Sequence, residues 1–338
     1  MKLKKIKSKK VCVNILFLMI LVIIHYTKMN YIYFLCQACL NEKIIEQKCS
    51  KCNADIIFKS IKYKLNDETL NELLYHHKSI ARFGDGEFEM IFGKKLGFQE
   101  FNEKLKEKLL IVLNSNIPNL LIGIPPLYKN KVPFWAKWLN KYKFKLGKII
   151  SKSKLYYAAG ITRFYIPTGN RTNMKNYIIK FKQLWNNRNI LIIEGYKTRL
   201  GFGNDLFDNA KSIQRIICPF ENAFKVYDKI FHYVKNLNIT QNTLILISLG
   251  PTATALTYDI VKSGMKNQVI DFGHFDIEYE YYLRKAKKKI RIPNKYVNEV
   301  RGGKKKIKPI KDSKFLSQIT FKYRISLSLK SLYIHQIK

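Results

Sequence analysis

The chain has 338 residues, of which 47% are hydrophobic, and this composition excludes a chain that is disordered throughout. Its 62 lysines and arginines outnumber its 24 acidic residues and give a formal charge of +38. Such an excess either reflects a general compositional bias or indicates an anionic partner such as nucleic acid, a phosphate-bearing substrate or a lipid surface. The lysines are spread along the whole chain, so the charge does not point to one segment.

Residues 1–30 begin with a basic stretch and continue with an apolar run from Val11 to Ile24. The run is shorter than the about 20 apolar residues of a typical membrane helix. We interpret it as an uncleaved membrane-anchor helix whose lysine-rich flank stays in the cytosol. A signal peptide and a buried helix of a soluble domain are the alternatives. We therefore expect a membrane-associated protein with a single N-terminal anchor and the rest of the chain in the cytoplasm.

Residues 31–58 hold four of the six cysteines, in two C-x2-C pairs separated by nine residues: Cys36, Cys39, Cys49 and Cys52. Two such pairs can offer four thiolates to one tetrahedral Zn²⁺ ion, and the spacing is similar to that of short zinc ribbons. The sequence therefore predicts a structural zinc site. Disulfides, which require an oxidising compartment, and free thiols remain alternatives.

Residues 59–303 alternate short apolar runs with segments of helical periodicity. Apolar runs that predict buried strands are Ser79–Phe83, 119–124, 189–193, 243–249 and 268–272. Helical spacing predicts helices at 100–114, 220–236 and 252–262. This alternation is typical of an α/β domain with a mostly parallel sheet and flanking helices.

Polar and glycine residues follow the predicted strands one after another, at residues 84–87, 194–205, 250–254 and 273–278. In parallel sheets, ligands bind beyond the carboxyl ends of the strands. A sheet without a site would scatter such residues, so their arrangement predicts a site at this edge.

The stretch that follows the first of these strands is "RFGDGE", residues 82–87. If it is extended, Asp85 and Glu87 point to the same side and can hold one Mn²⁺ or Mg²⁺ ion. Gly84 and Gly86 would let a ligand approach the backbone, and Arg82 would pair with phosphate. A glycine-bearing turn between two strands is the alternative.

The stretch "LGPTAT" predicts a strand, a glycine turn and a helix start. Free N–H groups at the helix start, together with Gly250, Pro251, Thr252 and Thr254, would suit a diphosphate. An ordinary threonine helix cap is the alternative. The P-loop pattern is absent.

Two further stretches carry candidate residues. Arg199, Asn204 and Asp205 lie in or beside "GFGNDLF" and would bind the diphosphate and the ring of a sugar or ribose, unless the stretch is a plain polar loop. Asp276 and Glu278 lie in "DFGHFDIEYEYY", where one carboxylate would accept a proton from a hydroxyl group.

Residues 304–338 form a basic tail. It is expected to be a linker into a short amphipathic segment, Phe315 to Lys338, which either contacts anionic lipid or is a solvated face.

Taken in order, these stretches and "NKYVNEVRGG" at Asn294–Gly303 resemble the bacterial GT-D family of glycosyltransferases over roughly Lys59 to Gly303. The resemblance implies a Rossmann-like fold, a nucleotide-sugar donor, typically a UDP-sugar, and a divalent cation held at Asp85 and Glu87. It also implies a hexosyltransferase that acts on a hydroxyl of a glycan or glycoconjugate.

Two alternatives remain open from the residues themselves. A metal-dependent phosphohydrolase would use the same carboxylates and phosphate-binding loop. A nucleic-acid-binding protein with a zinc ribbon would account for the charge. The concentration of acids and glycines after the strands favours the transferase, and we expect no specific nucleic-acid partner.

Overall fold

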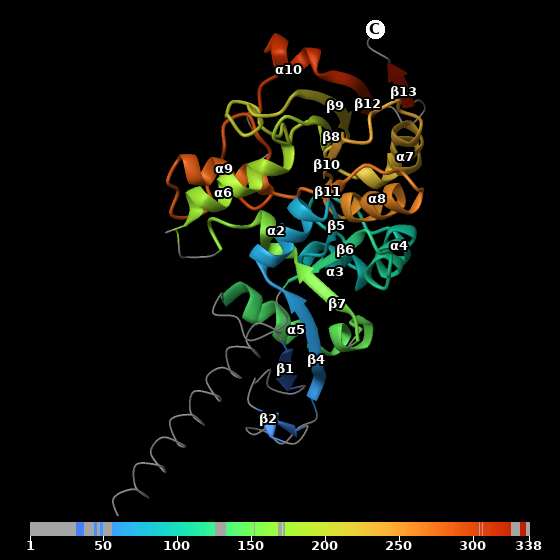
Figure 1. Cartoon of the computed structure of the whole chain (residues 1–338), viewed down its shortest axis with the longest axis vertical. Helices are drawn as coiled ribbons and strands as arrows, with labels where there is room; N and C mark the ends of the chain where they lie inside the picture. The colour runs from blue at the N-terminus through green and yellow to red at the C-terminus, as the bar shows by residue number, and fades with distance from the viewer. Residues whose placement is uncertain are drawn as a thin grey trace, which may run out of the picture. The chain divides into compact units, whose positions relative to one another are not determined.

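The computed structural model describes residues 32–36, 44–45, 48–49, 56–125, 133–151, 153–167, 171, 173–303, 305, 307–325 and 332–335 (Figure 1). The chain divides into two compact units. The first combines Met1–Lys64 with Pro126–Tyr156, and the second combines Leu65–Pro125 with Tyr157–Lys338.

The first unit is the smaller one. Its strand β1 (Ile32–Cys36) pairs antiparallel with β4 (Ile56–Lys64), and β2 (Ile44–Ile45) pairs antiparallel with β3 (Lys48–Cys49). Helix α5 (Pro133–Ile149) packs against β4. The buried side of α5 carries Trp138, Leu139, Tyr142 and Leu146, at the three- and four-residue spacing of one helix face.

The second unit is built on a sheet in which hydrogen-bonded neighbours follow the order β7-β6-β5-β11-β10-β8-β9-β12-β13. All of these neighbours are parallel except β12 and β13. The strands are β5 (Ser79–Arg82), β6 (Leu120–Ile124), β7 (Leu155–Ala158), β8 (Asn189–Gly195), β9 (Ser212–Cys218), β10 (Leu244–Ser248), β11 (Val269–Asp271), β12 (Ile319–Ile325) and β13 (Leu332–His335).

Helices cover both faces of the sheet, and the middle of each central strand is accordingly apolar, as at residues 190–193 and 244–247. Helices α7 and α8 lie on one side of β8 to β11, and α6 and α9 lie on the other (Figure 1). The helices of this unit are α2 (Asn66–Tyr75), α3 (Asp85–Ile91), α4 (Glu103–Leu113), α6 (Met174–Lys182), α7 (Tyr227–Lys235), α8 (Pro251–Lys262), α9 (Phe275–Leu283) and α10 (Ser313–Ser317).

The strand order reverses between β5 and β11. After β5, the next strands β6 and β7 are added on one side of it. Strand β11 pairs with β5 on the other side and comes after β8, β9 and β10 in the sequence. Ligands of open α/β sheets bind at such a switch point, beyond the carboxyl ends of the strands. Here those ends are Arg82 of β5 and Asp271 of β11.

The parallel sheet with flanking helices confirms the predicted α/β class, and the five predicted strands appear as β5, β6, β8, β10 and β11. The predicted helices at 100–114 and 252–262 appear as α4 and α8. The predicted helix at 220–236 is observed as a 3₁₀ turn, Ala223–Val226, followed by α7.

Three elements of the sheet differ from the sequence-based expectation. The sequence patterns did not predict β7 or β9, and Phe315–Lys338 were expected to form a tail outside the domain. That prediction is wrong for Ile319–Ile325, which form β12 and pair in parallel with β9. The strand is held because Phe321 and Tyr323 bury their rings, a tertiary contact that the basic surroundings of the segment concealed.

Two predictions fall largely outside the described residues. The N-terminal anchor lies within residues 1–31, and among the residues that the structure describes no helix has the length and hydropathy to cross a bilayer. Cys39 and Cys52 are also outside, and only the backbone strands of Cys36 and Cys49 are described. The zinc site stays a prediction.

Candidate functional site

The turn from β5 into α3 places the D-x-E residues at a helix start. Gly84 is the N-cap residue, Asp85 the first helical residue, and Glu87 the third. The backbone N–H of Gly84 donates a hydrogen bond to Oε2 of Glu87 at 2.6 Å, which is the acidic half of a capping box. The extended backbone assumed for this stretch is therefore wrong. Two residues two positions apart on a helix do not share a face, and Asp85 is exposed while Glu87 turns back to the cap.

The Arg82 side chain links β5 to β11 through hydrogen bonds and an ion pair with Asp271. Its Nε donates to the carbonyl oxygen of Asp271 at 2.7 Å, its Nη2 to Oδ1 of Asp271 at 3.2 Å, and its Nη1 to the carbonyl of Ala159 at 2.8 Å. The Thr254 hydroxyl from α8 donates to the Arg82 carbonyl at 2.8 Å and to Asp271 Oδ2 at 3.1 Å. The Arg82 side chain, predicted to pair with phosphate, is instead occupied by the protein itself.

The glycines of this edge are required by neighbouring side chains. A Cβ on Gly250, whose φ is +56°, would lie 2.5 Å from the Phe98 ring. A Cβ on Gly86 would lie 3.2 Å from Leu96, and one on Gly273 would collide with the Arg82 guanidinium. The segment that carries Leu96 and Phe98 thus covers two of the glycines that the sequence analysis assigned to ligand approach.

Carboxylates crowd at this edge and shift one another's titration. Burial, together with the negative charges of Asp271 and Asp85, raises the pKa of Glu87 to about 7, while the Gly84 N–H opposes the shift. Burial also raises the pKa of Asp271, against the lowering effect of Arg82 and Thr254.

A second cluster lies beside Asp85 and centres on Arg163, which follows β7. Its Nη1 and Nη2 donate to the two carboxylate oxygens of Glu299 at 2.8 and 3.1 Å. Nη2 also lies 3.0 Å from Nδ1 of His274, whose Nε2 lies 2.8 Å from Oδ1 of Asn298. Since a guanidinium can only donate, Nδ1 accepts and the imidazole is neutral with its proton on Nε2.

The electrostatics agree with this assignment. Burial and the Arg163 charge lower the pKa of His274 to about 4. Burial by itself would raise the pKa of Glu299, but the charge and hydrogen bonds of Arg163 prevail and lower it to about 2. The cluster therefore presents a fixed, ionised Arg163–Glu299 pair near the exposed carboxylate of Asp85.

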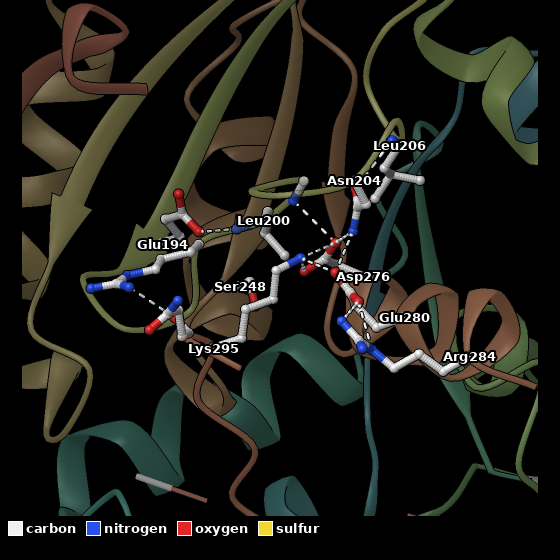
Figure 2. A network of polar contacts seen from close by, with 12 residues as sticks. Glu194, Leu200, Asn204, Leu206, Ser248, Asp276, Glu280, Arg284 and Lys295 are labelled. Atoms are coloured by element: carbon white, nitrogen blue, oxygen red, sulfur yellow. Dashed lines mark hydrogen bonds and ion pairs between the residues drawn. The ribbon is translucent and has the colours of Figure 1, made fainter. Parts of the chain in front are cut away.

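The two predicted proton acceptors lie on α9, facing different surroundings. Asp276 accepts from Lys295 Nζ at 2.9 and 2.7 Å, from the Gly201 N–H at 3.1 Å and from Asn204 Nδ2 at 2.9 Å. Figure 2 shows Lys295 and Asn204 converging on Asp276, with Glu280 beside it. Both oxygens of the Asp276 carboxylate thus accept hydrogen bonds from the protein, and its role as a base stays a prediction.

Glu278 is held differently. Its Oε2 accepts the backbone N–H groups of Tyr165 and Ile166 at 3.0 and 2.8 Å. Its Oε1 has no hydrogen-bond partner among the described residues and lies 3.8 Å from Arg163 Nη1. Burial raises the pKa of Glu278, although both N–H groups and Arg163 oppose the shift.

The remaining predicted residues mainly support the loops. Arg199 donates to the carbonyls of Asn294 and Lys308 at 2.9 and 2.6 Å and is buried. Asp205 is exposed and accepts the Tyr279 hydroxyl at 2.7 Å. Thr252 is buried near the start of α8, behind Pro251, and its hydroxyl has no partner among the described residues.

The structure thus gathers Arg82, Asp85, Glu87 and Thr254 at the β5–β11 switch point, and it brings Asn204 to Asp276 in a separate network. Sequence reasoning missed Arg163 and Glu299 as site residues. A signal existed for both: Arg163 follows a strand, and Glu299 lies in the stretch Asn294–Gly303 that carries the family resemblance.

Comparison with known proteins points to one family. The family described as "Glycosyltransferase GT-D fold" matches residues 80–300. A structure described as a new glycosyltransferase from Streptococcus sanguinis superposes with a TM-score of 0.72 at 33% identity, covering 77% of this chain and 98% of that one. Another, described as a domain of unknown function with a distinct glycosyltransferase fold, has a TM-score of 0.72, 33% identity and coverage of 78% and 95%.

Two curated proteins are similar in sequence. "Probable glycosyl transferase Gly" of Streptococcus gordonii is 36% identical over 241 residues, which is 69% of this chain and 35% of that protein. "Glycosyltransferase GlyD" of Streptococcus pneumoniae serotype 4 is 34% identical over 247 residues, 71% of this chain and 30% of that protein. The chain spans about a third of the length of these curated relatives.

Proposed function

Because the chain belongs to the glycosyltransferase GT-D fold family, we propose that it transfers a sugar from a UDP-sugar donor to a hydroxyl of a glycan or glycoconjugate, with the help of a divalent cation. The observation that carries the proposal is the crowding of Asp85, Glu87 and Asp271 at the strand-order switch point. Open α/β sheets bind nucleotides at this place, and crowded carboxylates favour a cation there.

The residues present suit Mn²⁺ or Mg²⁺. Both ions prefer oxygen ligands, and Mg²⁺ is commonly held by one or two carboxylates while phosphates and water complete the shell. Among the described residues no group of three or more side chains is placed to hold a metal ion, so Asp85 and Glu87 would need the phosphates of the donor to complete the shell. Asp85 is exposed, and Oε1 of Glu87 is not used by the cap. The cation would neutralise charge on a leaving diphosphate.

The protein's own residues would do the rest. Arg163, oriented by Glu299, would place its guanidinium beside Asp85, where a leaving phosphate gains charge. The start of α8 would offer backbone N–H groups and the unpartnered hydroxyl of Thr252. Of the two predicted bases, we favour Glu278, because one of its oxygens lacks a hydrogen bond and burial raises its pKa.

A thermal-shift experiment tests the proposal. The full chain is heated with UDP, other nucleotides and UDP-sugars, with and without Mn²⁺. A UDP species at about 100 times its dissociation constant should stabilise the protein by about 2.7 kcal/mol, which corresponds to a rise in melting temperature of about 5–10 °C. The rise should require Mn²⁺.

The variants make the result specific. Asp85→Ala should lose the metal-dependent rise, while Asp208→Ala, which removes another exposed aspartate, should keep it. Stabilisation by none of the nucleotides would contradict the donor assignment. With a UDP-sugar and Mn²⁺, release of free phosphate without a glycoside product would favour the phosphohydrolase instead.

A further inference from the structure

Most of the exposed side chains of α5 form one continuous stripe. With about 100° of rotation per residue, they fall within an arc of roughly 100°, and the exposed Asn140 lies just outside it. The residues of the stripe are Phe134, Lys137, Lys141, Phe144, Lys145 and Lys148. The opposite side of the helix is buried in the first unit. The stripe is therefore an outward surface of one straight element, about 21 Å long at 1.5 Å per residue.

Both phenylalanines of the stripe are exposed. Phe134 is 54% exposed and Phe144 is 53% exposed. They lie ten residues apart, which places about 15 Å between them along the helix axis. With lysines between them, they give this helix face both the apolar rings and the cationic groups that a helix uses at a membrane interface.

The charge of the stripe is positive, and the sequence around it is free of acidic residues. The sequence contains no aspartate or glutamate between Glu107 and Glu194, a stretch that includes all of α5. The helix therefore supplies no carboxylate to neutralise its lysines. A partner that matches this surface must carry negative charge and also accept two phenylalanine rings.

An anionic bilayer surface has both properties, since its headgroups are negative and its acyl boundary lies a few ångströms below them. The stripe contains lysine and no arginine. Lysine stems lie along apolar surface while their ammonium groups reach the headgroups. Nucleic-acid surfaces instead favour arginine, whose planar guanidinium pairs with phosphate and stacks on bases.

We propose that α5 is a peripheral membrane-binding helix, which lies on an anionic lipid surface with Phe134 and Phe144 inserted at the acyl boundary and Lys137, Lys141 and Lys148 at the headgroups. This contact is separate from the apolar segment near the N-terminus and does not depend on the proposed enzymatic activity.

Vesicle partitioning of the full chain tests the proposal. Vesicles are made of phosphatidylcholine alone or mixed with phosphatidylglycerol. Each lysine near an anionic surface contributes about a fivefold factor, so Lys137→Gln/Lys141→Gln/Lys148→Gln should lower the partition coefficient on anionic vesicles about 100-fold. Binding to neutral vesicles should change little, and salt should reduce the anionic binding of the unmodified chain.

A matched control removes the same charge elsewhere. Lys225, Lys229 and Lys235 are exposed on or beside α7, in the second unit. Their triple replacement by glutamine should leave anionic binding within a fewfold of the original. Equal losses in the two triple variants, or none in the α5 variant, would overturn the proposal. Loss of duplex DNA binding in the α5 variant with unchanged vesicle binding would also overturn it.

The N-terminal apolar segment needs its own control, because strong insertion there would hide the effect of α5. All variants are therefore repeated in a chain with Leu16→Gln, Leu18→Gln and Leu21→Gln, which interrupts the apolar run. In this background Phe134→Ser/Phe144→Ser should weaken binding to anionic vesicles at least tenfold. Unchanged binding would refute the insertion of the two rings.

Discussion

Replacing Lys295 by methionine should destabilise the protein strongly, because this buried lysine neutralises two buried carboxylates. Its Nζ lies 2.7 Å from Asp276 Oδ2 and 2.9 Å from Glu280 Oε1, and its side chain is 1% exposed. Removing one partner of a buried ion pair costs about 3–5 kcal/mol. Asp276 and Glu280 keep the amide of Asn204, so we expect the lower end, about 3 kcal/mol.

Urea unfolding of Lys295→Met measures this change, and a melting temperature lower by about 6–12 °C should accompany it. The matched control is Lys289→Met, which removes an exposed lysine 2.9 Å from Glu299 and should cost less than about 1 kcal/mol. If both variants lose the same stability, the network is not the structural support that its geometry indicates.

Asp276→Asn separates the two roles of that residue. If Asp276 is a catalytic base, the variant should lose turnover while its free energy of unfolding stays unchanged. If Asp276 is structural, the variant should have a lower free energy of unfolding, because Lys295 would keep only Glu280 as an anionic partner. We expect the second outcome.

Three further predictions concern the switch-point edge. Gly250→Ala should destabilise the protein by about 1–3 kcal/mol in urea unfolding, because the new Cβ would collide with Phe98 and the φ of this residue is positive. Adding Phe98→Ala should remove the collision and recover part of the lost stability. Glu299 has a folded pKa of about 2, below its ordinary value of 4.5, so its contribution of up to roughly 3 kcal/mol is present above pH 4.5 and is lost as the pH falls towards 2. Glu299→Gln should therefore lower stability at pH 7 and leave it nearly unchanged at pH 2, and equal losses at both pH values would contradict the pairing. Glu87→Gln should leave the metal-free melting temperature equal or higher, since it removes a half-buried charge while Oε1 of glutamine can still accept the Gly84 N–H, yet it should abolish the Mn²⁺-dependent response to UDP.

The sequence predicted the sheet well where burial is complete. Residues 190–193 and 244–247 are buried along their whole length, and such runs are recognisable without tertiary information. Strand β9 was missed because its first three residues are exposed or half-buried and its fourth is Arg215, a charged residue that is buried in an ion pair with Glu194 at 2.5 Å. That pair joins neighbouring strands and cannot be read from either strand alone.

The structure brings predicted site residues together at the predicted edge of the sheet, but their local geometry differs from the prediction. Glycines at 86 and 250 suggested space for a ligand, whereas Leu96 and Phe98 from a distant segment fill that space. The helical start of α3 had a visible signal, since Glu87 is three residues after the N-cap Gly84. The two-residue spacing of Asp85 and Glu87 is also the spacing of one face of a strand, and this second pattern obscured the capping signal.

The distribution of partners among the buried carboxylates argues for a cation at this edge. Glu194, Asp271 and Asp276 each have a basic partner, from Arg215, Arg82 and Lys295 respectively. Glu87 is half-buried near Asp271, yet among the described residues no cation forms an ion pair with it, and its pKa rises to about 7. A chain with 62 lysines and arginines has no shortage of positive side chains for this position. Because an unpaired, half-buried carboxylate is costly, its persistence at a switch point is best explained by a positive charge that arrives with the ligand.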